Sequence, residues 1–62
     1  MTIQELKEVE TNTKVIDMLT GEELEFIAYD ENVLHAGARC SNEKGITYWV
    51  RPEDLRLKVK GE

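Results

Sequence analysis

Residues 45–57 read Gly-Ile-Thr-Tyr-Trp-Val-Arg-Pro-Glu-Asp-Leu-Arg-Leu, and this stretch decides the fold. Residues 46–50 are β-branched or aromatic, which predicts a strand. Pro52 ends that strand, because proline has no N–H to donate within a sheet. Residues 51–54 then predict a single 3₁₀ turn, and the alternating apolar and basic residues 55–60 predict a short last strand.

Four further segments extend this pattern toward the N-terminus. Strands are predicted over residues 14–19, 24–29 and 33–41, with turns at residues 20–22, 30–32 and 42–45. Residues 2–10 predict a short helix, since Thr2 and Glu5 have the spacing of a capping box. Five short strands joined by tight turns favour a small antiparallel barrel over residues 13–62, preceded by a helical segment over residues 1–12 in the same single domain.

Length and composition restrict the class of protein. The chain has 62 residues, of which 40% are hydrophobic and 34% charged, and its net charge is −5. A chain this short has a small core, which argues against a deep substrate cavity. No apolar run is long enough to span a membrane, and the first residues lack the pattern of a signal peptide. The single cysteine, Cys40, fits a reducing compartment, so we expect a cytoplasmic protein.

The charges are distributed unevenly along the chain. Residues 1–31 contain nine acidic and two basic side chains, whereas residues 32–62 contain six basic and four acidic ones. Such asymmetry is typical of an interaction surface, although charged side chains also serve simply as solvated faces. The acidic total argues against sequence-independent DNA binding, which requires clustered lysine and arginine.

The order of hairpin, strand, 3₁₀ turn and last strand in residues 33–58 resembles SH3-like barrels. It is most similar to the small SH3-like proteins encoded by phages and prophages of Gram-positive bacteria. The resemblance implies a mostly β fold: a five-stranded antiparallel SH3-like barrel with a short N-terminal helix and a 3₁₀ turn before the last strand. Two departures argue against recognition of proline-rich peptides. The segment at residues 20–23 is short, and Leu55 stands where such domains place a groove tyrosine.

The resemblance also orients the side chains of the strand at residues 46–50. It places Val50 inside the barrel, and alternation then places Ile46 and Tyr48 inside as well. Thr47 and Trp49 face outward. An exposed tryptophan is a typical interaction hot spot, but Trp49 packing beneath the N-terminal helix against Ile3 and Leu6 is an equally supported interpretation.

Two other strands supply the remaining core positions. Alternation in residues 33–41 places Leu34, Ala36, Ala38 and Cys40 inside, with His35, Gly37 and Arg39 outside. Gly37 is expected to permit a bend, and Cys40 to be a small buried hydrophobe. In residues 24–29 the core face is either Leu24, Phe26 and Ala28 or Ile27 and Tyr29.

The sequence predicts no catalytic residue, no metal ligand set and no cofactor. His35 and Cys40 have opposite facings on one predicted strand, so they do not form a nucleophile pair. No grouped His and Cys ligands and no glycine-rich phosphate loop occur. We therefore expect a protein that is not an enzyme.

The leading hypothesis is a protein-interaction module of phage or prophage origin that binds and modulates a host protein with a basic surface, as a monomer or weak dimer and without membrane contact. Its predicted partner-binding residues are Trp49, Thr47, Arg51, Glu22, Glu23, Glu25, Asp30 and Glu31. The alternative is a nucleic-acid or ribonucleoprotein accessory module. Its surface would comprise Arg39, Lys44, Arg51, Arg56, Lys58 and Lys60 with Trp49 as a stacking platform, provided that the barrel brings the last three strands together.

Overall fold

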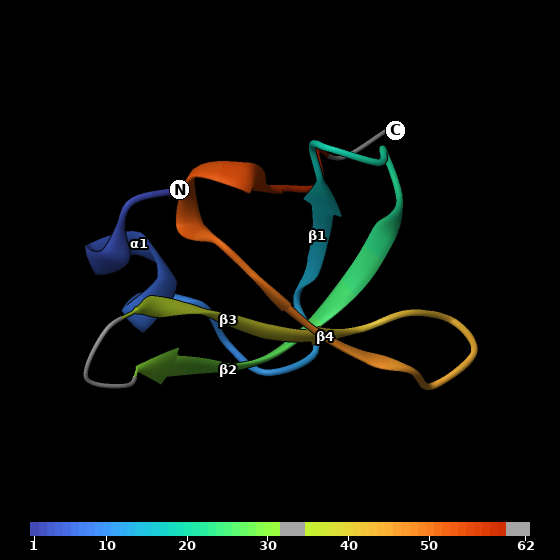
Figure 1. The fold of residues 1–62 in the computed structure, drawn as a ribbon, viewed down its shortest axis with the longest axis horizontal. Coiled ribbons are helices and arrows are strands. Elements are labelled where there is room, and N and C mark those ends of the chain that lie inside the picture. The colour runs from blue at the N-terminus through green and yellow to red at the C-terminus, as the bar shows by residue number, and fades with distance from the viewer. Residues whose placement is uncertain (32–34, 60–62) are drawn as a thin grey trace.

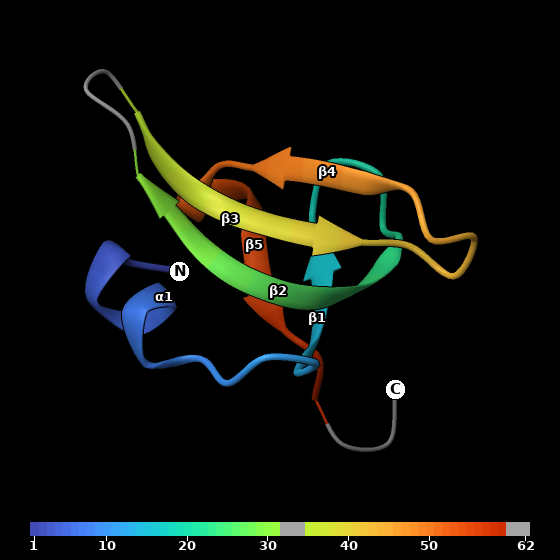
Figure 2. The ribbon, with the colours of Figure 1, turned by 90° about the horizontal axis from the view of Figure 1, so that it is seen from below.

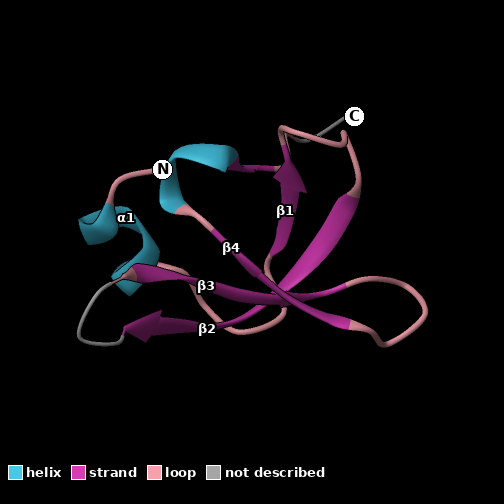
Figure 3. Cartoon of the chain, viewed as in Figure 1, coloured by secondary structure: helices cyan, strands magenta, loops and turns pink. Residues whose placement is uncertain are grey.

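A computed structural model describes residues 1–31 and 35–59 (Figures 1 and 3). Five antiparallel strands form one sheet in the order β4-β3-β2-β1-β5. The elements are α1 (Ile3–Glu8), β1 (Lys14–Asp17), β2 (Glu23–Glu31), β3 (Ala36–Ser41), β4 (Thr47–Val50), the 3₁₀ turn η1 (Pro52–Asp54) and β5 (Leu55–Leu57). The prediction of a mostly β domain with a short N-terminal helix and a 3₁₀ turn before the last strand is confirmed.

β2 is the longest strand and belongs to both halves of the sheet. Its beginning pairs with β1, and its remainder pairs with β3. A bulge between Phe26 and Ala28 shifts the register with β3. β2 is strongly curved, so that β1 and β5 run across the back of β3 and β4 (Figure 2). Bulges increase local bending and twist, and this one lets a single strand cross from one half of the sheet to the other.

The same bulge determines which face of β2 forms the core. Leu24 and Phe26 are buried before it, whereas Ala28 is exposed and Tyr29 packs against the core after it. An extra residue in a strand reverses the facing of everything that follows. The predicted core face of Leu24, Phe26 and Ala28 is therefore correct only before the bulge. The alternative face of Ile27 and Tyr29 is correct only after it.

One hydrophobic core lies between the halves of the sheet and the helix. Its buried members are Leu6, Val15, Leu24, Phe26, Ala38, Cys40, Val50 and Leu55. The predicted inward facing of Ala38 and Cys40 is confirmed. These small side chains on β3, the strand next to β2, leave room for Phe26, the largest fully buried side chain, because interiors are close-packed.

Helix α1 is short and begins with the predicted capping box. The Glu5 N–H donates to Thr2 Oγ1 at 3.1 Å, and the Thr2 N–H donates to Glu5 Oε1 at 2.8 Å. The hydrogen bond from the Thr2 N–H is the main cause of the lowered pKa of the Glu5 carboxyl. A helix of this length is not stable alone. Leu6, fully buried in the core, is the residue that anchors it.

Several predicted element ends differ from the structure. The helix ends at Glu8, β1 ends at Asp17 and β5 ends at Leu57, so that Met18 and Leu19 belong to the turn after β1. Asp30 and Glu31, predicted as a turn, continue β2, where they pair with Gly37 and Ala36 of β3. Cross-strand pairing outweighs the turn preference of these side chains. The predicted strand residues Val33 and Leu34, the turn residue Asn32 and Lys60 lie outside the described residues.

Leu6→Ala should lower the free energy of unfolding by about 2–5 kcal/mol, because it removes the buried anchor of α1 and leaves a cavity. Urea titration followed by circular dichroism measures this. Gln4→Ala, on the exposed side of the same helix, is the control and should stay within about 0.5 kcal/mol of the wild type. Equal stability of the two variants would show that the helix does not dock through Leu6.

Candidate interaction surface on strand β4

β4 lies at one edge of the sheet and pairs only with β3 in the described part of the chain. Asn42 organises the turn that leads into it. Its Oδ1 accepts the N–H groups of Lys44 and Ile46 at 2.9 and 3.0 Å, and its N–H donates to the Ile46 carbonyl. Gly45 has a φ of +82°, which a glycine adopts without steric cost. Local turn chemistry therefore determines where β4 begins.

The Trp49 side chain is 40% exposed and lies on the outer face of the sheet. Its indole lies against Gly37 of β3, where an added Cβ would come within 2.6 Å of the ring and 2.8 Å of the Val50 carbonyl oxygen. His35 meets the indole edge-on, with ring centroids 6.1 Å apart. Gly37 thus provides space for the indole, a role that differs from the predicted bend.

Two hollows flank Trp49, and both are also lined by Arg51. One has a volume of about 330 Å³, and its other lining residues are Ile3, His35, Ala36, Pro52 and Glu53. The second has a volume of about 360 Å³, and its other lining residues are Asp17, Leu19, Tyr48, Val50 and Asp54. We call these two hollows with Trp49 and Arg51 the β4 surface. It combines an aromatic ring and a guanidinium group, which are enriched where binding energy concentrates, with concave walls that are partly apolar and partly acidic.

The two interpretations of Trp49 each describe part of the structure. The indole is neither isolated in solvent nor packed on Leu6, which belongs to the core. Ile3, 45% exposed, lines a hollow with Trp49, so helix α1 borders the β4 surface without covering it. The expected outward facing of Trp49 agrees with its place on the sheet.

The prediction that Ile46 and Tyr48 point into the barrel is wrong. Their exposed fractions are 51% and 42%, whereas Val50 is buried. Alternation does place Tyr48 on the Val50 side, but the core ends at Val50, and the β3–β4 hairpin extends beyond it. Tyr48 therefore adds a second aromatic side chain to the β4 surface.

The sequence did not predict as binding residues four that line these hollows: Leu19, Tyr48, Pro52 and Ile3. Leu19 is 76% exposed in the turn after β1 and lines the second hollow together with Tyr48. The position of Leu19 directly before Thr20 and Gly21 could have indicated an exposed apolar residue, because a leucine within a turn is not buried in the core. Its proximity to β4 follows only from the fold.

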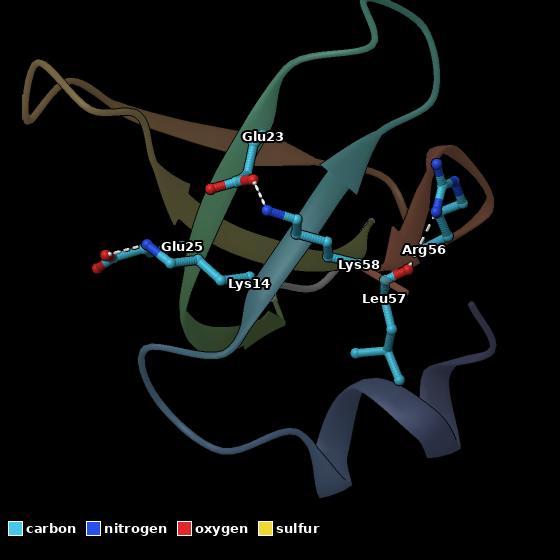
Figure 4. A network of polar contacts seen from close by, with 6 residues as sticks. All are labelled: Lys14, Glu23, Glu25, Arg56, Leu57 and Lys58. Carbon is cyan, nitrogen blue, oxygen red and sulfur yellow. Dashed lines mark hydrogen bonds and ion pairs between the residues drawn. The ribbon is translucent and has the colours of Figure 1, made fainter. Parts of the chain in front are cut away.

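The predicted acidic residues do not gather at Trp49. Glu23, Glu25 and Asp30 instead form ion pairs with Lys58, Lys14 and Arg39, respectively (Figure 4 shows the first two). The Lys58 ammonium lowers the pKa of the Glu23 carboxyl, and the hydrogen bond to Glu25 raises the pKa of Lys14. Glu31 accepts a hydrogen bond from the Tyr29 hydroxyl at 3.2 Å. Glu22 lies nearer to β4: with Glu23 and Glu43 it lines a hollow that reaches Tyr48.

The predicted cationic stripe requires β3, β4 and β5 to be neighbours, and they are not. β5 is separated from β3 by β2 and β1 in the sheet. Arg39 and Lys58 are engaged in ion pairs with acidic residues of β2, and Lys44 lies in the turn before β4. Arg56 lies on β5, where its guanidinium donates to the Leu57 carbonyl at 3.2 Å (Figure 4).

Cys40 and His35 lie apart, as predicted: Cys40 is on the core side of β3, whereas His35 precedes β3 and meets the indole of Trp49. Cys40 is fully buried. Burial, with a smaller effect from the negative charge of Asp17, raises the pKa of the Cys40 thiol to about 11. A buried, protonated thiol is a poor nucleophile, because the thiolate is the reactive form. Within residues 1–31 and 35–59, no three His, Cys, Asp or Glu side chains form a group suited to a metal ion.

Gly37→Ala should displace the indole of Trp49, because the new methyl group overlaps the ring. We expect a loss of about 1–3 kcal/mol in the free energy of unfolding, typical of overpacking, and a red shift of the tryptophan emission. Measuring the same substitution in a Trp49→Ala background gives the coupling energy between position 37 and the Trp49 ring. The loss should be smaller there, and additive losses would show that the ring is not the obstacle.

The stability of the protein should fall as the pH rises from about 9 to about 11. The thiol of the unfolded chain loses its proton near its ordinary pKa of 9.0, whereas the native Cys40 thiol keeps its proton until about 11. Ionisation therefore favours the unfolded state over this interval, by at most about 1.4 kcal/mol per pH unit. Urea titrations of the wild type and Cys40→Ala across this range isolate the effect, since other titrating groups are common to both. Parallel pH profiles would contradict it.

Among the described residues, no helix is long and apolar enough to cross a membrane. Comparison of the chain with protein-family models, with curated proteins and with solved structures gave no match in any of the three.

Proposed function

We propose that this chain is a non-enzymatic protein-interaction module that binds a partner protein through the β4 surface. The observation that carries this proposal is the half-exposed indole of Trp49, set between two hollows and beside Arg51. Tryptophan and arginine are among the residue types most enriched in binding hot spots, and the apolar parts of the two hollows allow a partner side chain to exclude water around them. Trp49 acts as the anchor, and Arg51 contributes hydrogen-bond donors at the shared boundary of the hollows.

The acidic surroundings support a partner with a basic face. Asp17 and Asp54 line one hollow, and Glu53 lines the other. Acidic residues at the rim of a surface accelerate encounter with a positively charged partner and disfavour partners of like charge. Ion pairing within the sheet reduces the acidic residues available for this role, which makes the carboxylates near β4 more important than the total charge.

The resemblance to small SH3-like proteins of phages and prophages extends the proposal. On this basis we propose a phage- or prophage-encoded protein, a monomer or weak dimer, whose partner is a bacterial host protein that it modulates. The single cysteine, Cys40, supports a cytoplasmic location. The nucleic-acid alternative has less support, because Arg39 and Lys58 already form ion pairs with Asp30 and Glu23. Clustered cations free to contact phosphate are what such binding requires.

Affinity capture from bacterial lysate tests the proposal, with wild type, Trp49→Ala and Leu57→Ala as baits and mass spectrometry as the readout. Leu57 is the matched control, an exposed apolar residue on the opposite edge strand. We expect one stoichiometric protein that survives nuclease treatment and is retained by Leu57→Ala. Trp49→Ala should weaken its binding by about 2 kcal/mol or more, which is about thirtyfold.

Two results would contradict the proposal. Equal capture by all three baits would show that the β4 surface is not the binding site. Loss of every captured protein on nuclease treatment would favour the nucleic-acid alternative instead.

A further inference from the structure

The two edges of the sheet differ in their free backbone groups. In an antiparallel ladder, hydrogen-bonded pairs alternate with pairs that are not hydrogen-bonded. The Asn42 N–H donates to the Ile46 carbonyl at 3.0 Å, so Asn42 and Ile46 form a hydrogen-bonded pair. Because the two kinds of pair alternate along the β3–β4 ladder, the backbone N–H and C=O groups of Tyr48 and Val50 bond to β3. The N–H and C=O groups of Thr47 and Trp49 point away from β3.

Nothing in the described part of the chain pairs with this outer side of β4. Within residues 1–31 and 35–59 the sheet ends there, and no backbone hydrogen bond joins the outward groups of Thr47 and Trp49 to another element. An unpaired row of donors and acceptors is a template for an additional strand. Natural proteins usually protect such an edge, so an edge left open beside an aromatic surface calls for a functional explanation.

The opposite edge, on β5, is protected. The Lys58 N–H donates to the Lys14 carbonyl, which by the same alternation directs the backbone groups of Leu55 and Leu57 outward. The Leu55 carbonyl accepts from the Met1 nitrogen at 2.8 Å, and its N–H donates to the Pro52 carbonyl. The Leu57 carbonyl accepts from the Arg56 guanidinium (Figure 4). Three of the four outward groups are thus occupied, so the open character of β4 is specific to that edge.

The surroundings of the open edge define the chemistry of its occupant. The second hollow lies beside β4, and Leu19, Asp17 and Asp54 line it together with residues 48–51. The hollow that reaches Tyr48 from the other side adds Glu22, Glu23, Glu43 and Lys44. Together these linings hold five carboxylates against two cations, and one carboxylate, Glu23, pairs with Lys58. The excess is negative, which opposes a second copy of this acidic chain and favours a basic segment.

We infer that β4 is a strand-addition site, at which an extended segment of the partner pairs with Thr47 and Trp49 and alternates apolar with Lys or Arg side chains. This inference rests on the proposed function and specifies how the partner binds. Backbone hydrogen bonds provide affinity in this mode, while alternate side chains of the segment provide specificity. Apolar side chains of the segment enter the hollows beside Trp49, and basic ones meet Asp17, Asp54 and Glu22.

The test is selection of short random displayed peptides against the folded protein. The tightest binder is then synthesised, both unmodified and N-methylated at alternate residues. We expect enrichment of Lys and Arg in alternation with apolar residues, and perturbation of the Thr47 and Trp49 amide resonances. These two amides should also gain protection from hydrogen exchange, whereas those of Tyr48 and Val50 are protected from the start. Only every second residue of the bound peptide directs its N–H toward β4. N-methylation of that set should weaken binding at least about tenfold, since it removes the donors that face β4, whereas N-methylation of the other set should not.

Variants of Thr47 test the same bonds from the protein's side. Thr47→Pro removes an outward N–H without breaking a bond to β3, and proline is tolerated on edge strands. It should keep the circular dichroism spectrum and lose at least about tenfold in peptide affinity, whereas Thr47→Val, which keeps the N–H, should bind normally. Should Thr47→Pro unfold the protein, the N-methylated peptides provide the same test on the wild type.

The outcomes separate this inference from the proposed function. A partner or peptide that depends on Trp49 but tolerates N-methylation and Thr47→Pro would overturn strand addition and leave the β4 surface as a side-chain docking site. Failure to enrich any peptide, or dimerisation of the protein through β4 in sedimentation analysis, would also overturn it. If no partner depends on Trp49, the proposed function itself fails.

Discussion

The bulge between Phe26 and Ala28 is the constraint on which the rest of this structure depends. It lets one strand, β2, begin beside β1 and continue beside β3, so that a single sheet folds around its own core. The bulge reverses the facing of β2, which keeps Phe26 inside and brings Tyr29 to the core on the other side. Small residues on β3 and the buried Leu6 of α1 complete the packing around Phe26, so that a chain of 62 residues encloses a continuous apolar interior.

The folded sheet has two edges, and they differ in how far their outward backbone groups are hydrogen-bonded. The β5 edge is occupied by hydrogen bonds from the Met1 nitrogen and the Arg56 side chain, while the outer groups of β4 have no such cover in the described residues. The aromatic side chains Tyr48 and Trp49 lie along the open edge, where Gly37 makes the close approach of the indole possible. Backbone and side chains at this edge therefore offer two kinds of recognition at one place, which is the physical basis of both proposals.

Charge has a smaller role than the linear sequence indicates. Among the described residues, ion pairs join the acidic first half to the basic second half: Glu23 of β2 meets Lys58 across β1, and Asp30 meets Arg39 on the neighbouring strand. Exposed pairs of this kind contribute little to stability, because water and salt screen them. Their larger effect is on recognition, since they leave the carboxylates around β4 as the acidic residues nearest to the exposed aromatic side chains.

The sequence by itself determined the elements: the capping box of Thr2 and Glu5, the turn at Gly45, the strand break at Pro52 and the small inward residues of β3. These features are local, since each depends on backbone chemistry or alternation within a few residues. The sequence also identified Trp49 and Arg51 as the centre of the candidate site. Only the tertiary structure decided that Leu19 and Ile3 border that site, that Ile46 and Tyr48 lie outside the core, and that the cations are dispersed. Those outcomes depend on strand order, on the bulge in β2 and on where the core ends, because contacts between residues distant in the chain are determined by the packing of the whole sheet.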